Sequence, residues 1–227
     1  MRRFEESTWQ GLPCDGPLRD LREALIFGHW LPGEPLDPDE VAMELSCSAD
    51  ALPAAFAVLE TEGLAERLPD GTYRAAPIER RATIQFLEVV RALSVRSYAL
   101  GVRAVTDGDL RIMRQALRAY ELTDADREPA TAVVETFVFN RPVHEAHGNQ
   151  ELIRQLDLLR PRMERIAMLV YPANATALGY ETLKGVLEAL ERDDPDAALK
   201  LFEDGVDQAI RTIELLPDGA FEELAAN

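Results

Sequence analysis

The chain has 227 residues, of which 47% are hydrophobic and 29% charged, and this balance indicates a globular protein of one or two domains rather than a disordered one. Its 24 basic and 41 acidic side chains give a net charge of −17, which argues against a protein that holds nucleic acid through a generally basic surface. No apolar run reaches the ~18 residues of a membrane span and no signal-peptide pattern opens the chain, so we expect a cytoplasmic protein with no membrane partner.

The N-terminal part predicts two helices after an irregular segment. Residues 1–17 contain several glycines and prolines and are expected to form an irregular arm, followed by a helix over 18–27. A second helix is expected to begin after Asp37, which can cap it, with Pro38 at the first position and Glu40 completing a capping box. These signals place a short helix shortly after the first.

A third helix and a hairpin follow. The apolar positions have the spacing of one helical face: Leu52, Ala55, Phe56 and Leu59. Two short strand-like segments over 64–75 then flank Pro69, Asp70 and Gly71, a hairpin signal. Helix, turn, helix and hairpin over 18–78 indicate a winged helix-turn-helix, in which the last helix normally enters the DNA major groove.

Everything from residue 79 to 216 has a helical pattern. The predicted helices lie near 80–104, 107–122, 129–147, 149–170, 177–192 and 194–215. Because no heptad pattern is sustained, a packed bundle is expected rather than a coiled coil, with an acidic tail over 217–227. The fold class is therefore mainly α: an N-terminal winged helix-turn-helix plus a six- to seven-helix bundle.

Three sequence blocks resemble one family of bacterial regulators. They are LREALIFG at 21–28, LPGEPL at 31–36 and LETEGL at 59–64. In these blocks and their spacing the chain resembles GntR-type transcription regulators, and the helical remainder resembles the FCD effector domain of one branch of that family. The resemblance spans residues 18–216. It implies a homodimer that binds DNA through the winged helix and a small organic ligand, such as a carboxylate, through the bundle.

The DNA-facing positions depart from the family pattern, in which the third helix opens with Ser-Arg-Thr-Pro-x-Arg. Ser48 matches, but Ala49 and Pro53 replace the two arginines, and Asp70 stands where the family has a cation at the wing tip. Residues 1–78 also hold six arginines, no lysine and fifteen carboxylates, a net charge of −9. DNA binding is therefore expected to be weak, altered or lost.

Pro53 also constrains where the third helix starts. If Ser48 caps the helix, Pro53 lies at its fifth position, at a cost of about 3 kcal/mol. A later start, with Asp50 as the cap and Pro53 in the first turn, avoids this cost and is expected here. Two interpretations remain: a DNA reader of altered specificity, or a winged helix retained for folding or dimer contacts.

The resemblance implies a divalent metal held by one aspartate and three histidines, and the matched positions lack these side chains. Thr136 occupies the position of the aspartate, and the positions of the three histidines hold Asn140, Leu183 and Gly205. We therefore expect no metal and no other cofactor. A substitute site from His144 and the nearby His147 remains an alternative.

Without its metal ligands, the implied metal site is expected to form a mixed polar and apolar pocket for a small organic ligand. Its predicted lining is Arg91, Phe137, Asn140, His144, Tyr180, Leu183, Gly205 and Gln208. Arg91 matches a family arginine and can either clamp a carboxylate or form an ion pair inside the bundle.

Two further hypotheses remain open. In the first, the bundle has become an enzyme acting on a small metabolite, with His144, Asn140, Arg91 and Tyr180 as candidate catalytic residues, although no catalytic motif is recognisable. In the second, the chain acts through a protein partner, by pairing with an intact paralogue or by mimicking DNA with its acidic surface.

Overall fold

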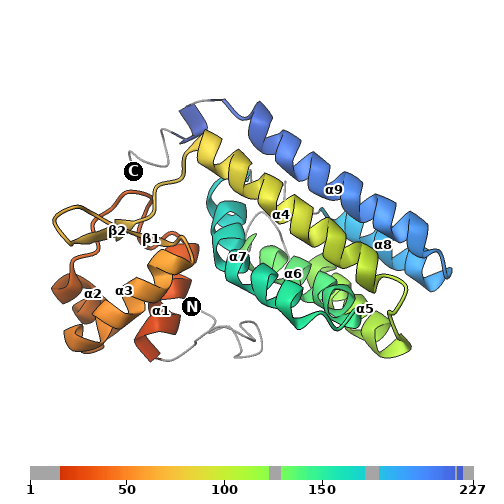
Figure 1. The fold of residues 1–227 in the computed structure, drawn as a ribbon, viewed down its shortest axis with the longest axis horizontal. Helices are drawn as coiled ribbons and strands as arrows, with labels where there is room; N and C mark the ends of the chain where they lie inside the picture. The colour runs from red at the N-terminus through yellow and green to blue at the C-terminus, as the bar shows by residue number, and fades with distance from the viewer. Residues whose placement is uncertain (1–15, 123–128, 172–178, 218, 222–227) are drawn as a thin grey trace. The chain divides into compact units, whose positions relative to one another are not determined.

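The computed structural model describes residues 16–122, 129–171, 179–217 and 219–221, and it is mainly α, as predicted (Figure 1). Contacts divide the chain into two units, which we call the winged-helix unit (residues 1–83, 157–170 and 217–227) and the bundle unit (84–156 and 171–216). The predicted helical domain 79–216 thus contributes two segments to the winged-helix unit. Nearly all of the predicted arm 1–17 lies outside the described residues.

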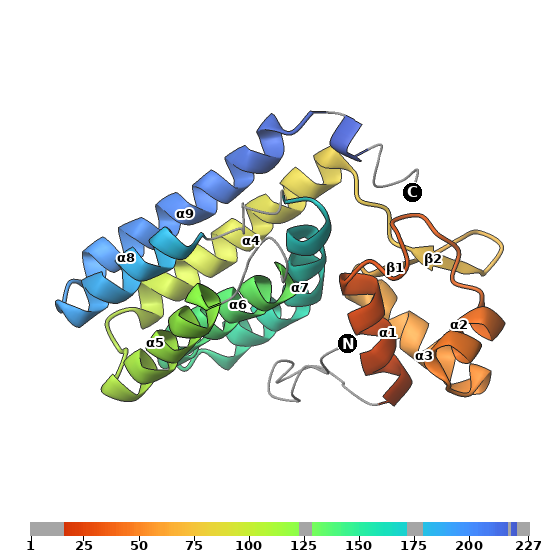
Figure 2. The ribbon, with the colours of Figure 1, turned by 180° about the vertical axis from the view of Figure 1, so that it is seen from behind.

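The winged-helix unit follows the predicted order of elements. They are α1 (Gly16–Ile26), α2 (Pro38–Leu45), the 3-10 turn η2 (Ala49–Ala51), α3 (Leu52–Thr61), β1 (Ala65–Arg67) and β2 (Tyr73–Ala75). The two strands are antiparallel, with Glu66 opposite Arg74, and form the predicted wing (Figure 2). Among the described residues, no single helix is long and apolar enough to span a membrane. The segments α2 and η2–α3 reach that length and apolar composition only when taken together, and they are bent by 111° relative to each other.

Local signals explain how α2 and α3 begin. The Asp37 carboxylate accepts hydrogen bonds from the backbone N–H groups of Asp39 and Glu40 at 2.9 and 3.2 Å, which confirms the predicted cap of α2. The predicted late start of α3 is also confirmed, because Pro53 lies in its first turn, where its missing N–H costs no helical bond. The predicted cap is wrong: Asp50 lies within η2, and Ala51 precedes α3 without a side-chain cap.

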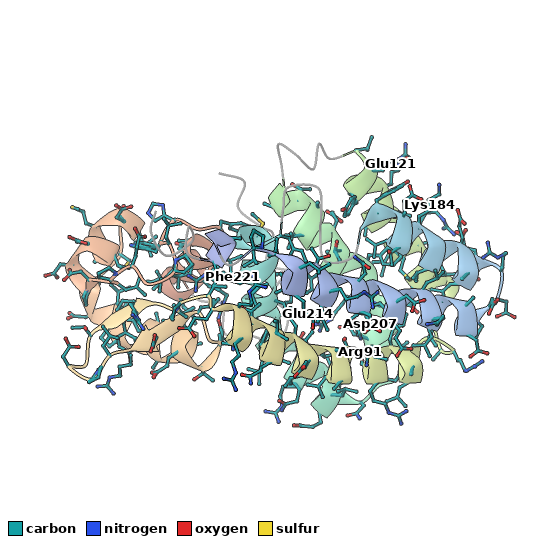
Figure 3. The ribbon with its side chains drawn as sticks, turned by 90° about the horizontal axis from the view of Figure 1, so that it is seen from above. Arg91, Glu121, Lys184, Asp207, Glu214 and Phe221 are labelled. Atoms are coloured by element: carbon teal, nitrogen blue, oxygen red, sulfur yellow. The ribbon has the colours of Figure 1, made fainter. Side chains whose placement is uncertain are left out.

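A buried ion pair and a buried arginine hold the winged-helix unit together. Arg22 of α1 donates two hydrogen bonds of 2.7 and 2.6 Å to Glu62, directly after α3. Arg165, in the second half of α7 (Gln150–Leu169), donates to the backbone carbonyls of Leu64 and Ala76 at 3.2 and 2.9 Å, on either side of the wing strands. In the predicted tail, Phe221 is buried and lies against the Arg80 guanidinium (Figure 3).

The bundle unit is built from six described helices, two of which, α4 and α7, extend into the winged-helix unit. One of the six is α7 (Gln150–Leu169), and the other five helices are α4 (Arg80–Gly101), α5 (Asp107–Glu121), α6 (Pro129–Ala146), α8 (Tyr180–Glu191) and α9 (Pro195–Leu215). In both ribbon views α4 runs beside α9, and α8 packs against α9 (Figures 1 and 2). Where α4 ends, Gly101 lets α6 approach closely, since a Cβ there would lie 1.8 Å from the Val143 carbonyl oxygen.

Candidate functional site

Three rings from three helices meet in the interior of the bundle unit. Tyr98 of α4 stacks on Phe202 of α9 with ring centroids 3.8 Å apart. The imidazole of His144, from α6, stands edge-on to both, at 5.5 Å from Tyr98 and 5.9 Å from Phe202. We call these residues, together with Asn140 one turn before His144, the bundle cluster.

A serine hydroxyl links two imidazoles beside this cluster. Ser97 Oγ lies 2.9 Å from His144 Nδ1 and 2.8 Å from His147 Nε2. The backbone N–H of Asn149 donates to His147 Nδ1 at 2.9 Å, so that nitrogen carries no proton. A neutral His147 must then donate from Nε2 to Ser97, and Ser97 donates to His144 Nδ1. The network therefore assigns the His144 proton to Nε2.

His144 is a neutral hydrogen-bond donor in this environment. Burial lowers its pKa from 6.5 to about 3, and the positive charge of Arg141, and of His147 when it is protonated, acts in the same direction. Burial also lowers the pKa of His147. Although protein atoms surround His144, its side chain keeps part of its surface accessible. His144 is therefore a neutral imidazole whose Nε2–H can donate a hydrogen bond.

Two buried polar atoms of the bundle cluster have no hydrogen-bond partner among the described residues: Tyr98 Oη and Asn140 Oδ1. Tyr98 is fully buried and Asn140 is 6% exposed. The amide nitrogen of Asn140 donates to the Thr136 carbonyl at 2.8 Å, which leaves only its oxygen unsatisfied. An unsatisfied buried polar group costs about 1–3 kcal/mol. Because most buried polar groups in native structures are hydrogen-bonded, each of these two atoms calls for a partner or a functional explanation.

The structure brings together only part of the predicted pocket. Leu183 and the Tyr98–Phe202 pair belong to one buried core, and Gly205 is buried one turn after Phe202 on α9. Phe137 is half-buried on α6, one turn before Asn140. Tyr180 is half-buried, with its ring 5.9 Å from Tyr120, and burial and Glu121 raise its pKa. Gln208 is exposed and accepts a bond from Arg211, so it lies outside the cluster.

Arg91 forms a partly exposed ion pair between α4 and α9 of the bundle unit. Its Nε and Nη2 nitrogens donate to the two carboxylate oxygens of Asp207, Nη2 also donates to Glu203 at 3.0 Å, and Asp207 raises the pKa of Arg91 (Figure 3). Because two carboxylates already hold this guanidinium, its use as a carboxylate clamp would require breaking those bonds. The arrangement agrees with the ion pair and not with the clamp.

Sequence reasoning missed the residues that contribute most to the cluster, Ser97, Tyr98 and Phe202. Tyr98 lies two helical turns after Arg91, and Phe202 one turn before Gly205, so helical spacing from the predicted positions could have identified both. No sequence signal indicated that Ser97 would bridge two histidines, because that contact joins residues 47 and 50 positions apart.

The side chains at the implied metal site do not fit a divalent cation. The Thr136 hydroxyl donates to the Ala132 carbonyl at 2.9 Å, and the Asn140 amide nitrogen donates to the Thr136 carbonyl. The side chains of Leu183 and Gly205 contain no atom that could bind a metal ion. His144 and His147 both direct a nitrogen at Ser97. Within the described ranges, no group of three or more His, Cys, Asp or Glu side chains could hold a metal ion.

The buried histidine gives the bundle unit an expected acid sensitivity. Because the folded-state pKa of His144 is depressed, its contribution to stability is present above pH 6.5 and is lost as the pH falls toward about 3. We expect the free energy of unfolding to fall by up to about 1.4 kcal/mol per pH unit across this window. Urea unfolding at several pH values measures this loss. His144→Gln should reduce the dependence of the free energy of unfolding on pH, whereas His29→Gln, in the winged-helix unit, should not. If both variants lose stability equally steeply as the pH falls, His144 is not the source of the acid sensitivity.

The DNA-facing positions carry no cation. Ser48 precedes η2 with its side chain exposed and making no cap bond, Ala49 lies in η2, and Pro53 is exposed on α3. Asp70 accepts hydrogen bonds from Thr72 N at 3.0 Å and Thr72 Oγ1 at 2.6 Å, and these bonds lower its pKa. The carboxylate that replaces the family's wing-tip cation therefore holds the turn of the wing.

The rest of the exposed surface of α3 is equally poor in groups that bind bases or phosphates. Its exposed side chains are Pro53, Ala54, Ala57, Glu60 and Thr61. Beside the wing, an open groove of about 600 Å³ is lined by Glu60, Glu66, Arg67, Leu68, Pro69 and Gly71. Arg67 makes no ion pair within the described part of this unit, while Arg74 pairs with Glu66 at 2.8 Å. One available guanidinium is a weak basis for holding a duplex.

Comparisons with known proteins agree with this architecture. The model of the FCD domain matches residues 85–206, more than half of the chain. A GntR transcriptional regulator from Rhodococcus sp. RHA1 superposes with a TM-score of 0.73 at 16% identity, covering 87% of this chain and 95% of that chain. E. coli McbR/YncC gives a TM-score of 0.67 at 18% identity with the same coverages.

Listeria monocytogenes Lar, which controls the expression of the agr system, gives a TM-score of 0.58 at 15% identity over 95% of this chain and 100% of that chain. A search of curated proteins returned no match. Neither these comparisons nor the described residues support the enzymatic hypothesis for His144, Asn140, Arg91 and Tyr180. The chain belongs to the FCD family of GntR-type transcription regulators, as its sequence blocks predict.

Proposed function

We propose that this GntR-type regulator binds a small organic ligand in its FCD bundle without a metal, and that its winged helix contacts DNA weakly, with altered specificity, or not at all. It would act in the cytoplasm as a homodimer, as its family implies. The observation that carries the proposal is that the fold is retained while the family's DNA-contacting cations and metal ligands are replaced at every matched position.

The bundle cluster supports the ligand-binding part of the proposal. Tyr98, whose hydroxyl is unsatisfied, has its ring 5.5 Å from the neutral His144, and Asn140, whose amide oxygen is unsatisfied, lies one turn before His144 on α6, next to a buried apolar core. This combination of apolar walls and a few fixed polar groups is typical of small-molecule sites. The expression control exercised by Listeria Lar, a structure of the same fold, supports a regulatory role.

The charge of the winged-helix unit supports the DNA part of the proposal. Protein–DNA affinity depends on neutralising phosphates with lysine and arginine and falls steeply with salt. The exposed surface of α3 offers Glu60 and no cation, and Asp70 lies at the wing tip. A duplex approaching these surfaces would therefore meet carboxylates close to its phosphates.

A DNA titration tests this proposal. We expect fluorescence anisotropy to show no saturable binding of the gene's own upstream region at ~150 mM salt and at most weak, non-selective binding at ~50 mM salt. A scrambled duplex of the same length is the control. Saturable, sequence-selective binding at a dissociation constant of about 1 μM or lower in ~150 mM salt would restore an ordinary DNA-binding regulator.

A further inference from the structure

The polar groups of the bundle cluster also specify the charge of its ligand, an inference that rests on the proposed function. We propose that the site takes an uncharged, planar organic molecule that accepts hydrogen bonds from Tyr98 and His144 and donates one to Asn140, and that it rejects carboxylates. This differs from the metal-held carboxylate that the FCD resemblance implies.

The first argument concerns the missing positive charge. Arg91 is shared by Asp207 and Glu203, so that group of three carries more negative than positive charge. Arg141 is paired with Glu145, and His144 is neutral because burial opposes its protonation. The guanidiniums of Arg91 and Arg141 are therefore both already paired with carboxylates. A carboxylate entering the bundle cluster would lose its hydration without gaining a counter-charge, which is strongly unfavourable.

The second argument concerns donors and acceptors. Asn140 Oδ1 can only accept a hydrogen bond, because the amide nitrogen already donates to Thr136. His144 can only donate from Nε2, because Ser97 occupies Nδ1. The Tyr98 hydroxyl is unsatisfied and can donate. A carboxylate has no proton to give to Asn140, whereas a primary amide, a lactam or a similar neutral group offers both a donor and a carbonyl acceptor.

The third argument concerns the shape of the ligand. The rings of Tyr98 and Phe202 are flat and stacked, and the side chains of Leu183 and Val143 add apolar surface in the same buried core. Aromatic rings favour stacked or edge-on partners, and such contacts contribute beyond the buried area alone. A planar body with one polar edge therefore matches both the apolar side chains and the three polar groups.

Benzamide and benzoate are a matched pair of probes, because they have nearly the same shape and differ in charge and in the N–H donor. Binding to the full chain is followed by NMR titration. For a fragment of this size, a dissociation constant of about 1 mM is expected for benzamide. Benzoate should bind at least about 10-fold more weakly at neutral pH.

Two variants test the hydrogen-bonding groups. Asn140→Leu and Tyr98→Phe should each weaken benzamide binding about 10-fold. Since Tyr98→Phe removes only an unsatisfied buried atom, the melting temperature of the free protein should stay the same or rise in this variant, and this separates lost binding from lost folding. Asn140→Leu also removes the amide bond to the Thr136 carbonyl, so its binding is measured well below its own melting temperature. Gln208→Leu, at an exposed position outside the cluster, should leave benzamide binding unchanged.

The outcomes distinguish this inference from the proposed function. If benzoate binds as tightly as benzamide, or if both Asn140→Leu and Tyr98→Phe retain full binding, the inference is overturned while a ligand-binding bundle stands. If neither probe perturbs the bundle at about 10 mM, the ligand-binding part of the proposed function fails together with the inference.

Discussion

Replacing Arg22 by methionine is expected to lower the free energy of unfolding of the winged-helix unit by about 3–5 kcal/mol. Arg22 and Glu62 form a two-bond ion pair in which the side chains are 0% and 2% exposed. Removing the guanidinium leaves the Glu62 carboxylate buried without its partner. The loss therefore reflects an uncompensated buried charge rather than the missing attraction alone.

Urea unfolding followed by tryptophan fluorescence measures this loss, since Trp30 lies in the same unit. The double variant Arg22→Met/Glu62→Leu should recover much of it, because both charges leave together. Arg19→Met is the matched control: its pair with Asp20 is partly exposed, at 25% and 44%, and should contribute no more than about 1 kcal/mol. Equal losses for Arg22→Met and Arg19→Met would contradict the argument.

Restoring the two family cations in η2 and at the start of α3 is expected to raise the affinity for duplex DNA by about 100-fold at ~50 mM salt. Ala49→Arg and Pro53→Arg return the side chains that the family uses at these positions, and Pro53 is exposed on α3. A bidentate arginine contact to a guanine edge contributes about 1–3 kcal/mol of discrimination against the wrong base. Asp70 is left in place, because its carboxylate holds the wing turn through Thr72.

The salt dependence of DNA binding checks the mechanism behind this gain. Two new phosphate contacts should steepen the slope of log affinity against log salt by about 2. Ala49→Met with Pro53→Met adds similar length without charge and should leave the affinity unchanged. A gain in the methionine variant, or no gain in the arginine variant, would show that charge is not what limits DNA binding.

Local sequence signals predicted most of the secondary structure. Asp37 and Pro38 fixed the start of α2, because a cap and a first-position proline act within one turn. Pro53 correctly excluded a helix beginning at Ser48, but the sequence did not identify η2, whose 3-10 turn carries the chain into α3 without a side-chain cap. The prediction that Asp50 caps α3 is wrong, because an aspartate just before a helix can lie within a 3-10 turn as well as at the cap position.

The candidate site depended on contacts that no local rule contains. Spacing placed Asn140 and His144 on one face of a helix, and the sequence alone left Arg91 with two possible roles. Its partner Asp207 lies 116 residues away, so only the packing of α4 beside α9 decided for the ion pair. The proton position on His144 likewise follows from Ser97, His147 and the Asn149 backbone, which come together only in the folded bundle.

The sequence by itself therefore determined the family, the order of helices, and the loss of the cations and metal ligands, since these depend on residue type and short spacing. Only the tertiary structure decided which polar groups remain unsatisfied, which charges cancel, and where a ligand can find a donor or an acceptor. The physical reason is that burial, hydrogen bonding and ion pairing are properties of neighbours in space, and in this bundle the decisive neighbours lie about 50 to 120 residues apart along the chain.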